Sequence, residues 1–313
     1  MGTEIVVGGG AVGTATALEL VGQGRDVVMV TRSGSGPVCA GISRVAADAA
    51  DAEVMARIAA GAEAIYNCAN PPYHRWSTEW PPIAASLLSA AVASGAVLVT
   101  MSNLYGYGPV DHPMVEEDPL AASGVKGRVR ATMWSDALDA HRSGRARVTE
   151  ARASDFFGPH VVGTSHFGRN MAKLLAGKRI SVLGDPDAPH SWTYVPDVGR
   201  TLARLAHDDR AWGRAWHVPS APEVSQRALA TEFCDLAGLP APRVSGIPPL
   251  ALVAAGLFSS QLRELRETLY QFDRPFVLDS SAMKRQFGLE ATPRETALRT
   301  TLEATRSTAP IGS

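Results

Sequence analysis

The order of hydrophobic and polar positions changes regularly along the first half of the 313-residue chain. Short apolar runs, many of them rich in β-branched residues, alternate with longer runs rich in alanine. The short runs are nearly continuous in hydrophobicity, which is typical of strands that helices cover on both faces. They predict strands at Glu4–Val7, Asp26–Thr31, Gly41–Ala46, Ala64–Asn67, Val97–Met101 and Arg147–Ala153.

The longer runs between these strands predict helices, because alanine and other good helix formers dominate them. Strands that alternate with helices in this way form a parallel sheet with crossover helices. We therefore predict an α/β fold built on a doubly wound parallel sheet. The predicted helices are Ala11–Gln23, Ala52–Ala60, Pro82–Ser94 and Arg130–His141.

The pattern becomes less regular after Gly158 and Pro159, where proline and glycine are frequent and the elements are shorter. We expect residues 1–160 to form the sheet domain. Residues 161–313 are expected to form mainly a smaller, substrate-binding region, with some elements returning to the sheet. The helices predicted in this second part are Gly168–Leu175, Val198–Ala206, Ser225–Ala237 and Leu262–Gln271.

A glycine-rich turn follows the first predicted strand and opens the first helix. Gly8, Gly10 and Gly13 make the pattern G-x-G-x-x-G, with Ala11 and Val12 between the last two glycines. Such glycines allow a tight turn and let the backbone approach a pyrophosphate, which then lies at the helix N-terminus. The order of strand, turn and helix predicts a Rossmann-type dinucleotide site to which all five residues contribute.

The end of the second predicted strand indicates which dinucleotide binds. Proteins that bind NAD place an acid there to hold the ribose 2′-hydroxyl, whereas a basic residue suits a 2′-phosphate. This chain has Thr31, Arg32 and Ser33 at that point and no carboxylate. We therefore predict NADP(H) as the cofactor, although an arginine on a surface loop is the alternative interpretation of Arg32.

Composition narrows the class of protein. The chain is 45% hydrophobic and 19% charged, as in ordinary soluble globular proteins. A formal net charge of -1 predicts neither a nucleic-acid nor a membrane partner. The three cysteines, Cys39, Cys68 and Cys234, are too few and too scattered for a disulfide framework or a zinc site. With no apparent signal peptide and no apolar run of membrane-spanning length, we expect a cytoplasmic protein.

With these features, the chain resembles the extended short-chain dehydrogenase/reductases, the group that contains nucleotide-sugar epimerases and dehydratases. The resemblance extends over essentially the whole chain and rests on several motifs together. These motifs are Val45–Asp48, Asn67–Asn70, Asn103–Gly106, Glu117–Leu120, Arg152–Pro159 and Trp192–Val198.

The resemblance implies further cofactor-binding residues beyond the glycine turn. One group would face the adenine, a second would form the loop after the fourth strand, and a third would lie near the nicotinamide. The residues concerned are Asp48, Ala49, Cys68, Ala69, Asn70, Met101, Lys126, Ala153 and Ser154.

The catalytic signature of that group is altered in this chain. Its members carry Y-x-x-x-K, in which the tyrosine protonates the carbonyl oxygen and the lysine lowers the tyrosine pKa. The matching positions here are Lys126 and Arg130, and the usual serine or threonine falls on Met101. The chain therefore resembles atypical members that lack the tyrosine, in particular ketoreductases of antibiotic pathways.

Hydride transfer to a ketone requires a group that stabilises and protonates the new alkoxide. Ser102, Lys126 and Tyr105 are the candidates, and Tyr73 lies with His74 on a loop that could reach a substrate. Each has a plainer alternative as a turn-forming serine, a solvent-facing lysine or a packed aromatic residue. Without a protein acid, the proton could come through water held by Ser102, or from a phenol of the substrate itself.

The second part of the chain holds aromatic and basic residues that could contact a substrate. Arg263 and Arg266 could bind an acidic group, or they could simply be solvated. The aromatic and apolar residues could line a pocket or belong to the core. They are His166, Phe167, Trp192, Phe258, Leu262, Tyr270, Phe272 and Phe276.

These features together predict an NADPH-dependent ketoreductase of secondary metabolism. Its expected partner is a small ketone, an aromatic polyketide, and the expected assembly is a monomer or homodimer. A nucleotide-sugar epimerase or dehydratase is the first alternative, but Arg32 and the missing tyrosine count against it. A non-catalytic NADP(H)-sensing protein is the second, which the missing tyrosine favours.

Overall fold

The computed structural model describes residues 2–161, 163, 165–248 and 266–308, and they form two compact units. Each unit is built from three separate segments of the chain. Unit 1 consists of Met1–Gly108, Glu116–Ala153 and Val198–Val218. Unit 2 consists of Pro109–Val115, Ser154–Asp197 and Pro219–Ser313.

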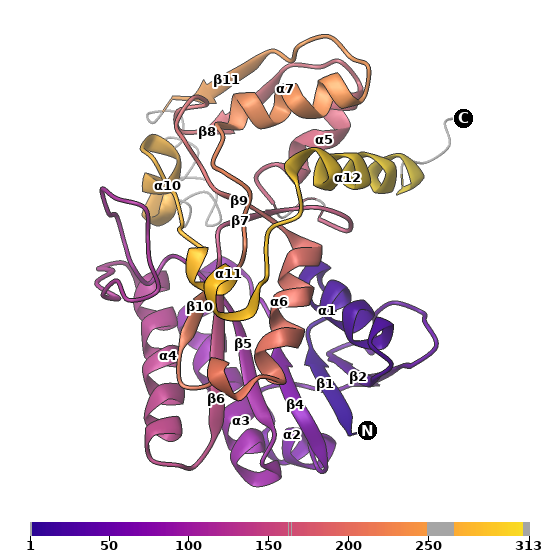
Figure 1. Ribbon diagram of the computed structural model, residues 1–313, viewed down its shortest axis with the longest axis vertical. Helices are drawn as coiled ribbons and strands as arrows, with labels where there is room; N and C mark the ends of the chain where they lie inside the picture. Colours follow the sequence, from indigo (N-terminus) through magenta and orange to yellow (C-terminus); the bar gives the residue numbers. More distant parts are fainter. Residues whose placement is uncertain (1, 162, 164, 249–265, 309–313) are drawn as a thin grey trace. The chain divides into compact units, whose positions relative to one another are not determined.

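Unit 1 contains a seven-stranded sheet in the order β10-β6-β5-β4-β1-β2-β3, in which all neighbours are parallel (Figure 1). The predicted doubly wound parallel sheet is confirmed. The strand order reverses beside β1, so the carboxyl ends of β1 and β4 flank the point at which such sheets bind their ligands. The strands are β1 Thr3–Val7, β2 Asp26–Thr31, β3 Ile42–Ala46, β4 Ala62–Asn67, β5 Val97–Asn103, β6 Arg147–Ala153 and β10 Ala215–His217.

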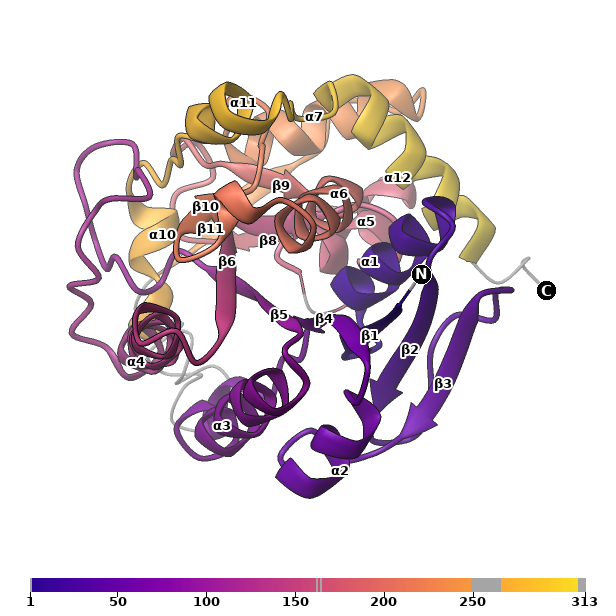
Figure 2. The ribbon, with the colours of Figure 1, turned by 60° about the horizontal axis from the view of Figure 1, so that its bottom comes forward.

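Helices cover both faces of this sheet (Figure 2). Helices α2, α3 and α4 cover one face, where Met55 and Leu87 pack against Ile5, Ile65 and Leu98 of the strands. Helices α1 and α6 lie on the other. Short 3-10 turns η1 Tyr73–Arg75 and η2 Asp209–Ala211 complete the connections. The helices are α1 Ala11–Gly22, α2 Ala52–Ile58, α3 Trp76–Ser94, α4 Val125–Arg142 and α6 Val195–Ala206.

Helix α3 begins earlier than its prolines predict. The sequence indicated a start at Pro82, but the helix begins at Trp76 and holds both Pro81 and Pro82 inside it. A proline inside a helix removes a backbone hydrogen bond and costs about 3 kcal/mol. Trp76 and Trp80 are completely buried in this first part of the helix. Burial of two indole rings offsets the cost, because each buries a large apolar surface.

Helix α4 also begins earlier, at Val125 rather than at Arg130. Lys126 and Arg130 therefore lie one turn apart on a single helix face. Gly127 allows the helix to approach the segment after β5, because a Cβ at this position would lie 2.5 Å from the carbonyl oxygen of Tyr105. Because α4 begins at Val125, both basic residues of the altered signature, Lys126 and Arg130, lie within the helix.

Unit 2 is smaller and contains two pairs of parallel strands, β8 with β11 and β7 with β9. Its core is aromatic, with Phe157, Phe167, Trp192 and Phe233 buried together. Its strands are β7 Asp155–Phe157, β8 Ile180–Leu183, β9 Trp192–Tyr194 and β11 Val244–Ile247. Its helices are α5 Gly168–Leu175, α7 Gln226–Leu236, α10 Tyr270–Asp273, α11 Ser281–Phe287 and α12 Arg294–Thr308, with the 3-10 turn η3 Arg266–Thr268.

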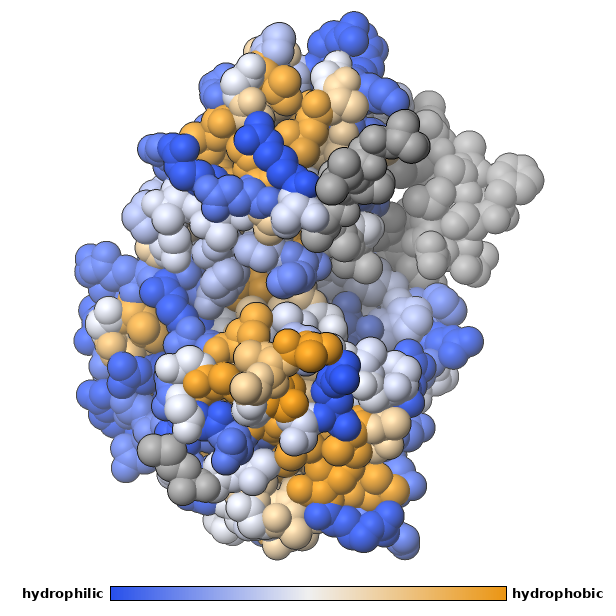
Figure 3. All heavy atoms as spheres, turned by 90° about the vertical axis from the view of Figure 1, so that its right-hand side faces the viewer, coloured by the Kyte–Doolittle hydropathy of each residue, from blue (hydrophilic) through white to orange (hydrophobic). Residues whose placement is uncertain are grey.

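The structure describes only part of the predicted substrate region. Phe258, Leu262 and Arg263 lie outside the described residues, as do the start of the predicted helix Leu262–Gln271 and the side chain of Arg266. Within the described part of the chain, no helix is both long and apolar enough to cross a membrane. On the face seen in Figure 3, hydrophobic side chains gather in patches among hydrophilic ones.

Candidate functional site

The turn between β1 and α1 can be built only with glycine at two of its positions. Gly8 has a φ of 108°, and a Cβ there would lie 2.6 Å from the carbonyl oxygen of Cys68. A Cβ at Gly13 would lie 1.9 Å from the carbonyl oxygen of Gly8. Gly10, in contrast, is the N-cap of α1 and has open space beside it. The turn is therefore tight where it packs on β4 and open where a pyrophosphate would approach.

The three residues predicted to select NADP(H) lie in one turn at the end of β2. The Gly34 N–H donates to the carbonyl oxygen of Thr31, at 3.2 Å, and closes the turn. The Thr31 and Ser33 hydroxyls donate to Ser35, to its carbonyl oxygen and its hydroxyl respectively. Arg32 is exposed, so its guanidinium can reach a ligand at this end of the sheet.

The other predicted cofactor residues lie at the carboxyl ends of strands. Asp48 follows β3 and accepts a hydrogen bond from the Ala50 N–H, on the other side of Ala49. Cys68 follows β4, ahead of Ala69 and Asn70, and burial raises the pKa of its thiol to about 12. Three further residues are Met101 and Ala153, buried in β5 and β6, and Ser154, which begins the second segment of unit 2.

Lys126 does not face solvent. It is 1% exposed, and its ammonium nitrogen lies 5.7 Å from the ring centroid of Tyr73. The Tyr73 hydroxyl lies 2.7 Å from the Tyr105 hydroxyl, within hydrogen-bond distance. The structure thus brings together two predicted catalytic candidates, Lys126 and Tyr105, and adds Tyr73 between them. Ser102, the third candidate, is buried in β5 opposite Arg152 of β6.

Arg130, one turn further along α4, lies against two indole rings whose planes are at 85° to each other. Its guanidinium carbon lies 4.7 Å from the ring centroid of Trp76 and 4.3 Å from that of Trp80. Burial lowers the pKa of Arg130 to about 10, against the attraction of nearby acidic groups. Its Nε is buried without a hydrogen-bond partner. Stacking on aromatic faces therefore compensates part of the cost of this buried charge, beside a hydrogen bond from Nη1 to the carbonyl oxygen of Met101 at 3.4 Å.

A second buried network links β6 to β10. Arg152 donates to Glu150 Oε1 at 2.6 Å and to the Tyr107 hydroxyl at 2.8 Å. That hydroxyl lies 2.8 Å from His217 Nε2, and the backbone N–H of His217 donates to Glu116. Burial raises the pKa of Tyr107 to about 12. The sequence does not indicate this network, because His217 is distant from the other members along the chain.

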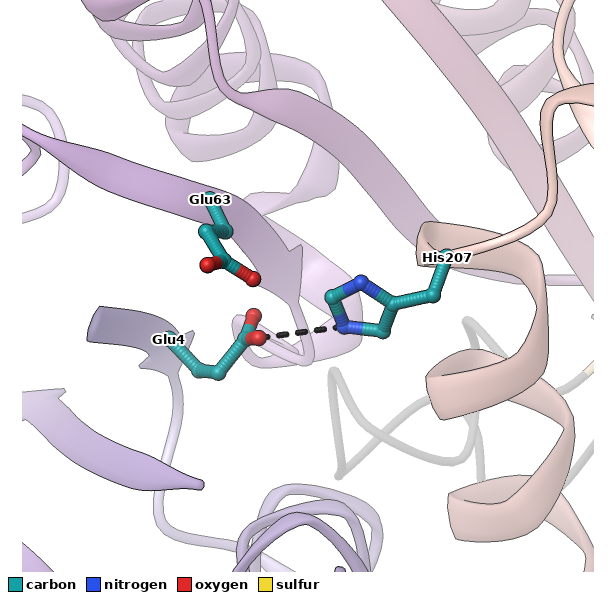
Figure 4. A group of neighbouring side chains, drawn as sticks. All are labelled: Glu4, Glu63 and His207. Atoms are coloured by element: carbon teal, nitrogen blue, oxygen red, sulfur yellow. Dashed lines mark ion pairs between the residues drawn. The ribbon is translucent and has the colours of Figure 1, made fainter. Parts of the chain in front are cut away.

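A group of charged side chains lies at the opposite, amino-terminal edge of the sheet (Figure 4). Oxygen and nitrogen atoms of Glu4, Glu63 and His207 lie within 4.8 Å of one another, a spacing that could hold a metal ion. However, Arg25 donates to both carboxylates, at 2.7 Å and 2.8 Å. Its guanidinium already supplies the cation, so we interpret the group as an ion-pair network that joins the strand ends.

Unit 2 has its own buried polar group around Asp155. His190 Nε2 lies 2.8 Å from Asp155, and its Nδ1 lies 3.1 Å from the carbonyl oxygen of Gln271. His166 Nε2 lies 3.7 Å from the other carboxylate oxygen of Asp155, and burial lowers the pKa of His166 to about 4. Among the predicted pocket residues, His166, Phe167, Trp192, Phe272 and Phe276 are all buried, as core residues are.

The fold and the glycine turn define a dinucleotide-binding α/β protein. The chain belongs to the NAD dependent epimerase/dehydratase family, whose family model matches residues 5–218. That family lies within the extended short-chain dehydrogenase/reductases and is NAD-dependent. A search of curated proteins finds no match.

Solved structures share the fold at low sequence identity. UDP-glucose 4-epimerase of Thermotoga maritima, with UDP-glucose, has a TM-score of 0.82 at 18% identity, over 98% of this chain and 99% of that chain. The dTDP-glucose 4,6-dehydratase of Bacillus anthracis, with NAD, has a TM-score of 0.81 at 16% identity, over 99% and 98%. DesIV, the dTDP-glucose 4,6-dehydratase of Streptomyces venezuelae, has 0.79 at 20% identity, over 98% and 97%. These similarities extend the fold over essentially the whole chain.

Proposed function

We propose that this protein is an NADPH-dependent ketoreductase that reduces a ketone on an aromatic, polyketide-like secondary metabolite. The observation that carries the proposal is the basic end of β2, where Arg32 is exposed between two hydroxyl residues. A guanidinium there suits a ribose 2′-phosphate, whereas an acid suits the free hydroxyl of NAD. NADPH is consumed as a reductant, which favours net reduction over an epimerisation that recycles its cofactor in place.

The residues present fit such a cofactor. The space beside Gly10 and the N-terminus of α1 suit the pyrophosphate, and Arg32 suits the 2′-phosphate. When bound, the reduced dinucleotide supplies a hydride to the ketone carbon. The chain's own residues then hold both reactants and stabilise the charge on the alkoxide oxygen. Lys126 provides a buried positive charge for this purpose from the first turn of α4.

The altered signature agrees with a reductase. An epimerase or dehydratase of this kind needs a tyrosine that removes a proton from a sugar hydroxyl, and Lys126 occupies that place in the resemblance. A reductase can lose one general acid and remain active, because such a group adds only about 10²–10⁴-fold. Holding the reactants in position can account for about 7–11 kcal/mol of the barrier without any acid.

The test is NADPH oxidation with a panel of hydroxylated aromatic ketones and quinones. We expect at least one compound to be converted to a product with two more hydrogens, detected by mass spectrometry, while NADPH absorbance falls. The same preparation is incubated with UDP-glucose and dTDP-glucose. Turnover of a nucleotide sugar without NADPH oxidation would establish the epimerase or dehydratase alternative instead.

A non-catalytic NADP(H) sensor is the second candidate, and the loss of the signature tyrosine favours it. A sensor binds NADPH but leaves it reduced with every ketone and converts no nucleotide sugar. Isothermal titration with NADPH, run beside the turnover assays, therefore separates a sensor from a protein that lacks the cofactor site.

A further inference from the structure

Two tyrosine hydroxyls from different loops meet at the carboxyl edge of the sheet in unit 1. Tyr73 lies in η1, after β4, and Tyr105 lies just after β5. Their hydroxyl oxygens are 2.7 Å apart. The carboxyl ends of parallel strands are where doubly wound sheets bind ligands, so the pair lies at the edge of the sheet where a reaction is expected.

The two tyrosines differ in exposure. Tyr105 is 7% exposed and its ring lies 5.9 Å from that of Trp76, whereas Tyr73 is only partly buried. The pair holds two hydroxyl protons, and only one of them can lie in the bond between the two oxygens. Because Tyr73 is the more exposed of the two, its hydroxyl can contact a substrate, whereas Tyr105 lies deeper in the protein.

Two buried cations from α4 lie beside this pair. The Lys126 ammonium is 5.7 Å from the Tyr73 ring centroid, and Arg130 is stacked on Trp76, which itself contacts both tyrosine rings. Positive charge close to a phenol favours its deprotonated form. The cations that replace the usual signature thus flank hydroxyls that come from elsewhere in the chain.

We propose that Tyr73, backed by Tyr105 and Lys126, is the general acid that protonates the alkoxide formed by ketone reduction. The proposal rests on the proposed reductase function. When bound, the reduced dinucleotide would supply a hydride to the carbonyl carbon, which leaves an alkoxide on its oxygen. The Tyr73 O–H bond then breaks as an O–H bond forms on the alkoxide oxygen. The Tyr105 hydroxyl donates a hydrogen bond to the phenolate left on Tyr73, which then regains a proton from solvent.

Phenolate formation in the protein alone gives a test that needs no substrate. Burial raises the pKa of Tyr107 and Tyr270 to about 12 and that of Tyr66 well above its usual value. Early ultraviolet absorbance of phenolate in a rapid pH jump therefore comes from the remaining tyrosines. Comparison of the wild type with the double variant Tyr73→Phe/Tyr105→Phe shows how much of this absorbance comes from the pair.

The decisive comparison is Lys126→Met, which keeps much of the side-chain volume and removes the charge. We expect the phenolate signal of the pair to move to higher pH, because a nearby cation no longer stabilises the deprotonated form. Tyr66→Phe is the matched control, since it removes a buried hydroxyl that lies by His207 and should leave the pair's signal in place. An unchanged signal in Lys126→Met would overturn the coupling on which the proposal depends.

Single-turnover reduction of the best ketone from the panel tests the proton transfer itself. We expect Tyr73→Phe to slow it by about 10²-fold or more, with NADPH affinity unchanged. A smaller loss would overturn the proposal and leave the proton to water or to a substrate phenol. If the wild-type protein reduces no ketone at all, the proposed function fails, while the phenolate titration still decides whether the pair and Lys126 act together.

Discussion

A single guanidinium stands at the end of β2, where the ribose of a bound dinucleotide would lie. We expect Arg32→Ala to weaken NADPH binding by about 10–100-fold, because a charge-assisted hydrogen bond contributes about 1.5–3 kcal/mol. NADH affinity should change little, since NADH has no 2′-phosphate. Fluorescence titration of both cofactors against both proteins measures the effect. Equal wild-type affinity for NADPH and NADH would contradict the assignment of Arg32.

Two glycines of the β1–α1 turn offer a matched pair of substitutions. Gly13→Ala places a methyl group 1.9 Å from the carbonyl oxygen of Gly8, so it should lower the melting temperature of the free protein. Gly10→Ala points its methyl group into open space and should leave that temperature unchanged. It should nevertheless weaken NADPH binding, because the methyl group occupies space expected for the pyrophosphate. If Gly10→Ala binds NADPH as the wild type does, the pyrophosphate lies elsewhere.

Helices α3 and α4 are joined by the Arg130 side chain, which lies against Trp76 and Trp80. We expect Arg130→Ala to lower the free energy of unfolding by about 2–4 kcal/mol, through loss of the stacking and the cavity left behind. Arg130→Met should cost less, because it fills much of the volume and removes a buried charge. Urea denaturation compares the three proteins. Undiminished stability of Arg130→Ala would mean that the contact of Arg130 with the two indole rings does not stabilise the packing of the helices.

The regular elements were predictable because each depends on local pattern. The apolar runs gave the first six strands, and Gly8, Gly10 and Gly13 gave the turn, since backbone geometry demands glycine there. The early start of α3 was not predictable, because Pro81 and Pro82 suggest a boundary that only tryptophan burial overrides. The elements of unit 2 have weak hydrophobic patterns, so its short strands were not predicted.

The candidate site was predictable only in part. Lys126 and Tyr105 were found by position in a resemblance, but nothing in the sequence placed Tyr73 between them. Their contact depends on how two loops and one helix pack, across 53 residues of chain from Tyr73 to Lys126. All three cysteines are free thiols, as their small number predicted; Cys68 and Cys234 are buried and Cys39 is partly buried.

We expect acid to lower the stability of the fold through a buried histidine of unit 2. The pKa of His166 falls from 6.5 to about 4 on folding, chiefly through burial, so the unfolded chain takes up its proton first. We expect the stability contributed by this group to be complete above pH 6.5 and to decrease by about 3 kcal/mol as the pH falls to 4. Asp155, His190 and Arg169 face this ring, and the lowered pKa of Asp155 matters only below its usual 3.8.

The check is urea denaturation of the wild type and of His166→Phe between pH 7 and pH 4. We expect the stability of the variant to change less with pH over this range, because its ring binds no proton. His166→Gln serves as a polar control of similar length. Parallel curves for wild type and His166→Phe would show that another group governs the acid response.

The order of the strands in the sheet differs from the order in which a ribosome makes them. Strand β6 pairs with β5 on one side and with β10 on the other, through Glu150–Arg152 opposite Ala215–His217. A ribosome has therefore made six strands and most of the helices of unit 1 well before it makes the seventh. During the interval, β6 presents unpaired backbone groups along an open edge, which is the kind of surface that recruits strands of other chains. Residues 154–214 lie between the two strands, so this whole stretch, which includes residues 154–197 of unit 2, is made before that edge can close.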